Sequence, residues 1–134
     1  MIAVDTSVVV AAFGAWSPNH LEARGVLAKG CALPAHCGLE VFSVLTRLPD
    51  PFRAPPAIAA AFLDRRFGPR WLAPTPETVR ALPQRLADLG LWGGPIYDAL
   101  VAATAADHGA TLFTLDSRAE PTYRAIGAAY EVLS

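Results

Sequence analysis

Short apolar runs alternate with longer amphipathic stretches along the chain. A short apolar run bounded by Gly, Pro or an acid is typical of a buried strand, whereas apolar residues three and four positions apart are typical of one helix face. Strands are predicted at residues 1–4, 31–33, 71–72, 111–115 and 130–133. Helices are predicted at residues 8–13, 18–28, 38–48, 57–67, 78–89, 96–108 and 121–126.

Local signals mark the ends of several of these helices. Thr6 and Ser7 precede the first helix, where a hydroxyl can cap the free N–H groups. Gly109 follows the sixth helix, as a C-terminal glycine commonly does. Pro83 falls inside the fifth helix and is expected to bend or split it.

Strands that alternate with helices predict an α/β domain, in which helices cover both faces of a mostly parallel sheet. The length of 134 residues suits one domain, residues 1–134, and no repeat or linker divides it. Hydrophobic residues make up 53% of the chain and charged residues 17%, which excludes a disordered chain.

The formal net charge of -1 excludes a global positive field that would attract nucleic acid. A phosphate-containing partner must therefore be bound locally. All of the 11 basic residues except Lys29 are arginine, whose guanidinium group can bind phosphate through two parallel hydrogen bonds.

The N-terminal apolar run is interrupted by Asp5, and the longest uncharged stretch, residues 6–21, contains several polar residues. We therefore expect neither a secretion signal nor a membrane span. Cys31 and Cys37 lack the spacing of a metal site, which favours buried thiols in a reducing cytosol. The expected location is the cytoplasm, with no membrane partner.

Four acids lie at the ends of predicted strands or near the starts of predicted helices. Asp5 and Asp116 end strands, while Glu40 and Asp98 lie near the starts of helices. In an open parallel sheet, the carboxyl ends of the strands and the N-termini of the helices meet at one edge, where ligands bind. Each acid taken singly is better explained by a structural role such as helix capping, which Asp5 and Asp98 could provide. All four at one edge are better explained as a functional site.

Four neighbouring carboxylates cannot all ionise without compensation, so either some are protonated or a hard divalent cation balances them. Mg²⁺ and Mn²⁺ suit ligands that are all oxygen. Such a site can hold one or two ions that activate water and neutralise charge on a phosphodiester. Thr6 is expected either to contact a metal-bound water or to cap the first helix.

Four segments resemble, in order and spacing, the PIN-domain toxins of VapC type, and together they span essentially the whole chain. They are I-A-V-D-T-S-V-V-V-A-A-F, L-E-V-F-S-V-L-T-R-L-P, I-Y-D-A-L-V-A-A-T-A and G-A-T-L-F-T-L-D-S-R-A. The resemblance implies a PIN fold with strand order 3-2-1-4-5. Its acidic site corresponds to Asp5, Glu40, Asp98 and Asp116, with the Thr6 hydroxyl beside it.

The same resemblance implies a Mg²⁺- or Mn²⁺-dependent endoribonuclease that is the toxin of a toxin–antitoxin pair. Its partners would be RNA and a small VapB-like antitoxin, and its assembly a homodimer, or a heterotetramer or larger complex with the antitoxin. Relatives often have a basic residue directly after the last acid, whereas this chain has Ser117 and then Arg118. Arg118 is therefore the candidate for a phosphate contact.

A catalytically silent PIN-fold protein that binds RNA or acts as a scaffold is the alternative, because a fold does not fix a function. The loss of an acid would indicate it, and all four acids are present. A receiver domain or a haloacid-dehalogenase-like phosphatase is disfavoured, since Asp5 is followed by Thr6 and Ser7 rather than by a second acid.

The histidines and large aromatic residues have less specific patterns. The three histidines share no spacing and are expected to be structural or exposed. The tryptophans, with Phe62 and Phe67, either belong to the core or line an exposed apolar groove for a partner, and the core is favoured in a domain of this size. A groove for an antitoxin helix is predicted between helices 38–48 and 57–67. Its candidate walls are Phe42, Phe52, Phe62 and Phe67.

Overall fold

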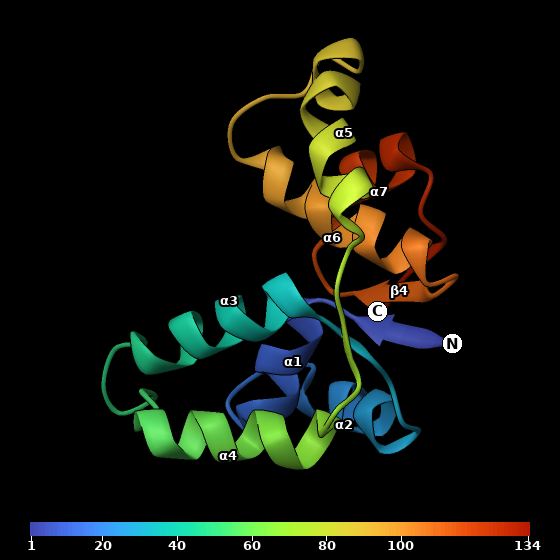
Figure 1. Cartoon of the computed structure of the whole chain (residues 1–134). Coiled ribbons are helices and arrows are strands. Elements are labelled where there is room, and N and C mark those ends of the chain that lie inside the picture. The colour runs from blue at the N-terminus through green and yellow to red at the C-terminus, as the bar shows by residue number, and fades with distance from the viewer.

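The computed structural model describes residues 1–134 and contains five short strands and seven α-helices (Figure 1). Every element predicted from the sequence is present, with ends that differ by at most three residues. The strands are β1 (Ile2–Val4), β2 (Leu33–Pro34), β3 (Trp71–Leu72), β4 (Thr111–Thr114) and β5 (Tyr130–Val132). The helices are α1 (Thr6–Phe13), α2 (His20–Ala28), α3 (Ala35–Thr46), α4 (Pro56–Phe67), α5 (Pro76–Asp88), α6 (Pro95–Asp107) and α7 (Glu120–Ile126), and a 3-10 turn, η1 (Ser117–Ala119), precedes α7.

The strands form two parallel sheets, in the orders β1-β4-β5 and β2-β3. The expected single sheet in the order 3-2-1-4-5 is therefore not confirmed. Between the two sheets there is one isolated bridge, in which the Val4 N–H donates to the Ala32 carbonyl at 3.1 Å. The break follows from the shortness of β2, whose second residue is Pro34 and has no N–H to donate.

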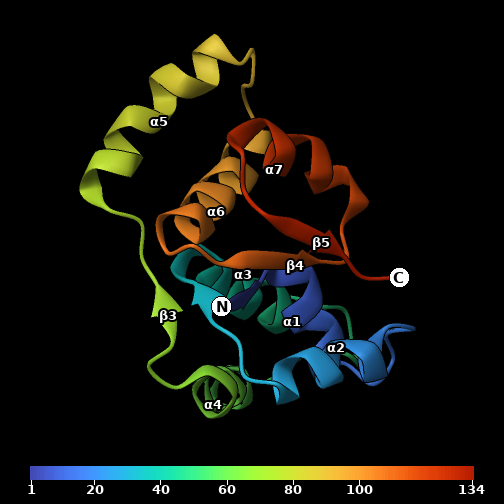
Figure 2. The same ribbon diagram turned by 90° about the vertical axis from the view of Figure 1, so that its right-hand side faces the viewer.

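Helices cover both faces of the β1-β4-β5 sheet, as the sequence predicts (Figure 2). Helices α6 and α7 pack on one face, and α1 and α2 lie on the other. Helices α3 and α4 form a hairpin-like pair beside α1 (Figure 1). This arrangement places the N-termini of α1 and α6 near the carboxyl ends of β1 and β4.

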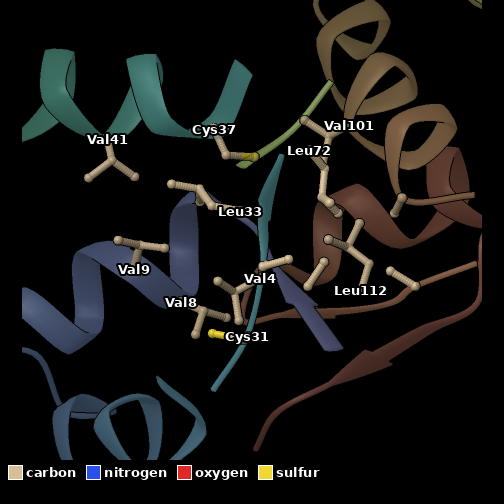
Figure 3. Packing of buried hydrophobic residues seen from close by; sticks show 14 of the residues in the cluster. Val4, Val8, Val9, Cys31, Leu33, Cys37, Val41, Leu72, Val101 and Leu112 are labelled. Atoms are coloured by element: carbon tan, nitrogen blue, oxygen red, sulfur yellow. The ribbon is translucent and has the colours of Figure 1, made fainter. Parts of the chain in front are cut away.

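The hydrophobic core joins α1 and α3 to the sheets. Figure 3 shows Val9 of α1 and Val41 of α3 near Leu33 of β2, and Val8 of α1 near Cys31. The side chains of Val8, Val9, Val41 and Leu33 are fully buried. Burial of each contributes about 1.5–3 kcal/mol to stability, so the relative placement of α1 and α3 is strongly fixed. The polar residues at the start of α1 and in α3 are thereby held beside one another.

Some local expectations need correction. The cap of α1 is the Asp5 carboxylate and not a hydroxyl. Helix α3 begins after Pro34, so Glu40 lies in its second turn and not near its start. Helix α5 continues through Pro83 without a break, because Pro83 is exposed and water can bind the carbonyl that loses its helical partner.

The tryptophans also differ from the expectation of core residues, since Trp16, Trp71 and Trp92 are 46%, 37% and 77% exposed. Phe67 is buried as expected. Trp16 and Trp92 lie in the loops after α1 and α5, and Trp71 lies in the two-residue edge strand β3, positions in which a large ring is only partly covered. No helix of the fold combines the length and apolar character needed to cross a bilayer.

Candidate active site

Asp5 follows β1 and begins α1, and its carboxylate is held by four hydrogen bonds. Its Oδ1 accepts from the Ser7 N–H at 3.0 Å, the Ser7 Oγ at 2.5 Å and the Val8 N–H at 3.4 Å. Its Oδ2 accepts from the Tyr123 hydroxyl at 2.8 Å. Oδ2 therefore has more capacity left for a ligand than Oδ1. Burial raises the pKa of Asp5 above its usual value in spite of these donors.

Glu40 is tied to the first turn of α1 by Thr6, whose hydroxyl donates to Glu40 Oε1. Of the two roles expected for Thr6, capping of α1 is therefore wrong, because its hydroxyl is directed to another helix. The imidazole Nε2 of His36, one turn before Glu40, lies 4.0 Å from Glu40 Oε2. Glu40 thus has a hydroxyl donor on one oxygen and an imidazole near the other.

Asp98 lies in the first turn of α6 and is half-buried. Its pKa is raised to about 6, first by burial and then by the negative charges of Asp116, Asp5 and Glu40, while His36 opposes the shift. The other three carboxylates therefore lie near enough to Asp98 for their charges to act on it. The fold places the four acids predicted from the sequence in one region, although no three of them surround a common point closely enough to hold a metal ion.

Asp116 follows β4 and caps η1. Its Oδ1 accepts from the Arg118 N–H at 3.0 Å and lies 3.4 Å from the Arg118 Nε. The Arg118 side chain is 92% exposed, so this ion pair is weak and the guanidinium group can move to another anion. Arg118 is therefore at the edge of the acidic site, defined here as Asp5, Glu40, Asp98 and Asp116.

Two residues that support the acidic site are not evident from the sequence. Ser7 Oγ accepts from the Leu115 N–H at 2.9 Å in addition to donating to Asp5, which connects α1 to the end of β4. Tyr123 comes from α7 and is 1% exposed. Burial and the charge of Asp5 raise the pKa of Tyr123 far above its usual value, so its hydroxyl remains a donor. The only sequence signal was that both side chains are polar and near predicted helices.

The acidic site has the donor chemistry of a hard divalent cation. All four side chains offer only oxygen, and their mutual repulsion, expressed in the pKa of Asp98, is the imbalance that a cation would relieve. The residues that could hold Mg²⁺ or Mn²⁺ are the four acids, whose side chains would have to move closer together around the ion.

The cysteines and two of the histidines lie outside this chemistry, as expected. Cys31 and Cys37 are buried free thiols, and burial raises the pKa of Cys31 to about 11. His20 Nδ1 and His108 Nε2 each lie 2.8 Å from a backbone carbonyl oxygen. His36 is the exception, because it borders Glu40 and stacks on Tyr97. His36 was expected, like the other two histidines, to be structural or exposed, and the structure places it beside the acidic site.

A groove of about 510 Å³ lies between α3 and α4. Of the four phenylalanines predicted as its walls, only Phe42 lines it. Phe67 is buried, Phe62 faces a hollow between α2 and α4, and Phe52 packs against Trp16. The residues that line this α3–α4 groove are Gly38, Leu39, Phe42, Ala60, Leu63, Asp64, Gly68, Pro69 and Trp71.

Strand ends and helix starts that converge on a cluster of acids define an α/β protein with a carboxylate site at the edge of a parallel sheet. The PIN domain family matches residues 2–125. Ribonuclease VapC40 of Mycobacterium tuberculosis is 42% identical over 134 residues, which is all of both chains. The chain belongs to the PIN-domain family and, within it, to the VapC type.

Solved structures agree with this assignment at the level of the fold. VapBC2 of Rickettsia felis, bound to a DNA fragment from its promoter, has a TM-score of 0.69 at 17% identity and matches over 100% of both chains. VapC20 of Mycobacterium tuberculosis, a sarcin-ricin loop cleaving toxin, has a TM-score of 0.71 at 20% identity, covering 90% of this chain and 94% of VapC20. The PIN fold expected from the sequence is therefore confirmed.

Proposed function

We propose that this protein is a Mg²⁺- or Mn²⁺-dependent endoribonuclease and the toxin of a toxin–antitoxin pair. The observation that supports this most strongly is that Asp5, Glu40 and Asp116 lie near enough to Asp98 for their charges, in addition to its burial, to raise its pKa. The full-length similarity to Ribonuclease VapC40 supports the reaction class. All four acids are present, which favours an enzyme over a silent scaffold.

The chain's own residues would prepare the site for the cation and for the phosphodiester. Ser7 and Tyr123 hold the Asp5 carboxylate in one orientation, which directs the remaining capacity of Oδ2 to a ligand. The Thr6 hydroxyl donates to Oε1 of Glu40 and so restricts the orientation of this carboxylate. When bound, Mg²⁺ or Mn²⁺ would activate water and neutralise the charge that develops during in-line displacement at phosphorus.

Arg118 is the residue at this edge that can bind phosphate. It is highly exposed and engages Asp116 only through a weak ion pair, so it can turn to a phosphate oxygen without a large energetic cost. Because the protein has no excess of positive charge, local contacts of this kind must supply the electrostatic attraction for RNA.

The test is cleavage of total cellular RNA by the purified protein, with the ends of the fragments mapped. We expect internal cuts with Mg²⁺ or Mn²⁺, no cuts in the presence of a strong chelator, and restoration when the cation is returned. Asp116→Asn should lower the rate by orders of magnitude. Cleavage that persists in the chelator, or an Asp116→Asn rate equal to the wild-type rate, would reject the proposal.

The proposed partner is a small antitoxin encoded beside this protein, which fits its amphipathic helix into the α3–α4 groove. The exposed apolar residues at this groove include Leu39 and Trp71, which are 71% and 37% exposed. The groove borders α3, which contains Glu40, so an Arg or Lys of the antitoxin could pair with the acidic site and block it.

Co-expression with the neighbouring small reading frame tests this partner. We expect an inactive complex and a loss of binding in Leu39→Asp, with RNA cleavage retained. Leu21→Asp is the matched control, since Leu21 is 79% exposed and lies on α2, outside the groove. A complex that is as active as the free protein would overturn the inhibitory role. Light scattering of the free protein and of the complex would test the proposed homodimer and the larger assembly.

The proposed location is the cytoplasm, where an RNA substrate is present. Two free, buried thiols are compatible with a reducing compartment. Fractionation of cells that express the protein at its natural level should recover it with cytosolic proteins, and recovery in an exported fraction would contradict this location.

A further inference from the structure

Tyr97 and His36 form a parallel aromatic pair at the edge of the acidic site. Their ring planes differ by 3° and their centroids are 5.1 Å apart. Tyr97 immediately precedes Asp98 in the first turn of α6, and His36 lies one turn before Glu40 in α3. The pair therefore connects the two helices that supply two of the four acids.

Packing of the core does not account for Tyr97. Its side chain is 54% exposed, and its one aromatic neighbour within the protein is His36. His36 covers one face of the phenol ring and restricts its rotation, while a large part of the ring is left accessible. An exposed aromatic ring that is already ordered loses little conformational entropy when a second flat group stacks on it.

Stacking suits this location because it requires no positive charge. The four carboxylates make the site repulsive to phosphate in the absence of a cation, and the basic residue found at its edge is Arg118. A nucleobase is a flat, uncharged group, and stacking on an aromatic side chain contributes to binding of single-stranded RNA for every kind of base. RNA can thus be held beside the acids without further arginines.

We propose that Tyr97 binds a nucleobase of the RNA substrate, next to the cleaved phosphate, by stacking, and that His36 is the positioning residue that holds the Tyr97 ring. This inference rests on the proposed ribonuclease function. Because Tyr97 and Asp98 are neighbours in the chain, the stacked base belongs to a nucleotide adjacent to the cleaved bond and not to a distant part of the RNA.

Steady-state cleavage of a short single-stranded RNA with a mapped cut tests the pair. Tyr97→Ala should raise KM by about tenfold with kcat changed much less, because stacking holds the substrate and does not take part in the chemistry. Tyr97→Phe should stay close to wild type. His36→Ala should raise KM by a smaller factor, and His36→Phe, which keeps a flat ring, should restore it.

An RNA with an abasic nucleotide beside the cut separates stacking from a structural effect. On this RNA, wild type and Tyr97→Ala should have the same KM, because there is no base to stack. If Tyr97→Ala leaves KM unchanged on the normal RNA, or raises it equally on the abasic RNA, the inference is wrong. Matching thermal melts of the variants would confirm that all of them are folded.

A binding measurement distinguishes failure of this inference from failure of the proposed function. The probe is a single-stranded 12-nucleotide RNA with 2-aminopurine in place of adenine, whose fluorescence falls when the base stacks. Wild type should quench it more strongly than Tyr97→Ala does. If the wild-type protein cleaves RNA but quenches no more than Tyr97→Ala, only the stacking role is rejected. If it cleaves no RNA, the proposed function is rejected, and equal quenching would then reject the stacking role as well.

Discussion

Replacement of Asp98 by Asn should stabilise the protein when no divalent cation is present. The carboxylate is half-buried and close to three other acids, which raise its pKa to about 6 from 3.8. In the folded protein it binds a proton up to about pH 6, whereas in the unfolded chain it loses that proton above about pH 3.8. The free energy of unfolding of wild type therefore falls as pH rises through this window.

The size of the effect follows from the shift. About two pKa units correspond to roughly 3 kcal/mol, at about 1.4 kcal/mol for each unit. Because Asp98 is only half-buried, solvent screening reduces this to about 1 kcal/mol. The expected gain at pH 8 is a melting temperature higher by about 3–5 °C.

The assay is thermal unfolding followed by circular dichroism, in buffer with a chelator, at pH 8 and at pH 4. Asp98→Asn should unfold at a higher temperature than wild type at pH 8, and the difference should nearly vanish at pH 4, where Asp98 is protonated in the folded protein. Asp64→Asn is the control, because Asp64 is exposed on α4 and lies outside the acidic site. Its melting temperature should stay within about 1 °C of wild type at both values of pH.

Two outcomes would refute this reasoning. A variant less stable than wild type at pH 8 would mean that Asp98 stabilises α6 as a helix residue and is not repelled by the other acids. A gain that is equal at pH 8 and pH 4 would mean that the effect of Asn is unrelated to the charge of Asp98.

Three further predictions concern the surroundings of the acidic site. Tyr123→Phe removes the 2.8 Å hydrogen bond to the buried Asp5 carboxylate and should lower the free energy of unfolding, measured in urea, by about 1–3 kcal/mol. An unchanged free energy of unfolding would mean that this hydrogen bond does not stabilise the fold. Cys31 and Cys37 should react slowly with a thiol reagent at pH 8 in the folded protein and rapidly in denaturant, because they are buried and the pKa of Cys31 is raised. Rapid reaction of the folded protein would contradict this burial. Arg118→Ala should weaken RNA binding severalfold with little effect on Mn²⁺ affinity; an equal loss of both would show that Arg118 does not act through phosphate.

Much of the fold could be predicted because its elements depend on local patterns. Pro and Gly residues and apolar spacing located all seven helices and five strands. The division into two sheets could not be predicted in this way, since it depends on the pairing of a two-residue strand that ends at Pro34. Exposure of Trp92 and Trp16 was also missed, because hydrophobicity alone does not indicate how much of a large ring the remaining core can cover.

The places of Asp5, Asp98 and Asp116 could be predicted because strand ends and helix starts have a fixed relation to the edge of a parallel sheet. Glu40 lies in the second turn of α3, so its place depends on how α3 packs on α1. The side chains that contact these acids could not be predicted from the sequence. Tyr123 is 118 residues from Asp5 in the sequence, and its hydroxyl reaches the carboxylate only because α7 packs on α6. His36 has no spacing that relates it to Tyr97, so their stacking depends on how α3 and α6 meet. Side-chain contacts between distant segments are tertiary information that local patterns do not contain.

The central claim, that Asp5, Glu40, Asp98 and Asp116 form one site for a divalent cation, is tested most directly by calorimetric titration of the metal-free protein with Mn²⁺. The wild-type protein and the control Asp64→Asn should bind Mn²⁺ with the same affinity. Asp98→Asn should bind at least tenfold more weakly, because Asp98 is the acid that interacts with the other three. Equal affinity in wild type and Asp98→Asn, or no binding of Mn²⁺ by the wild-type protein, would contradict the claim.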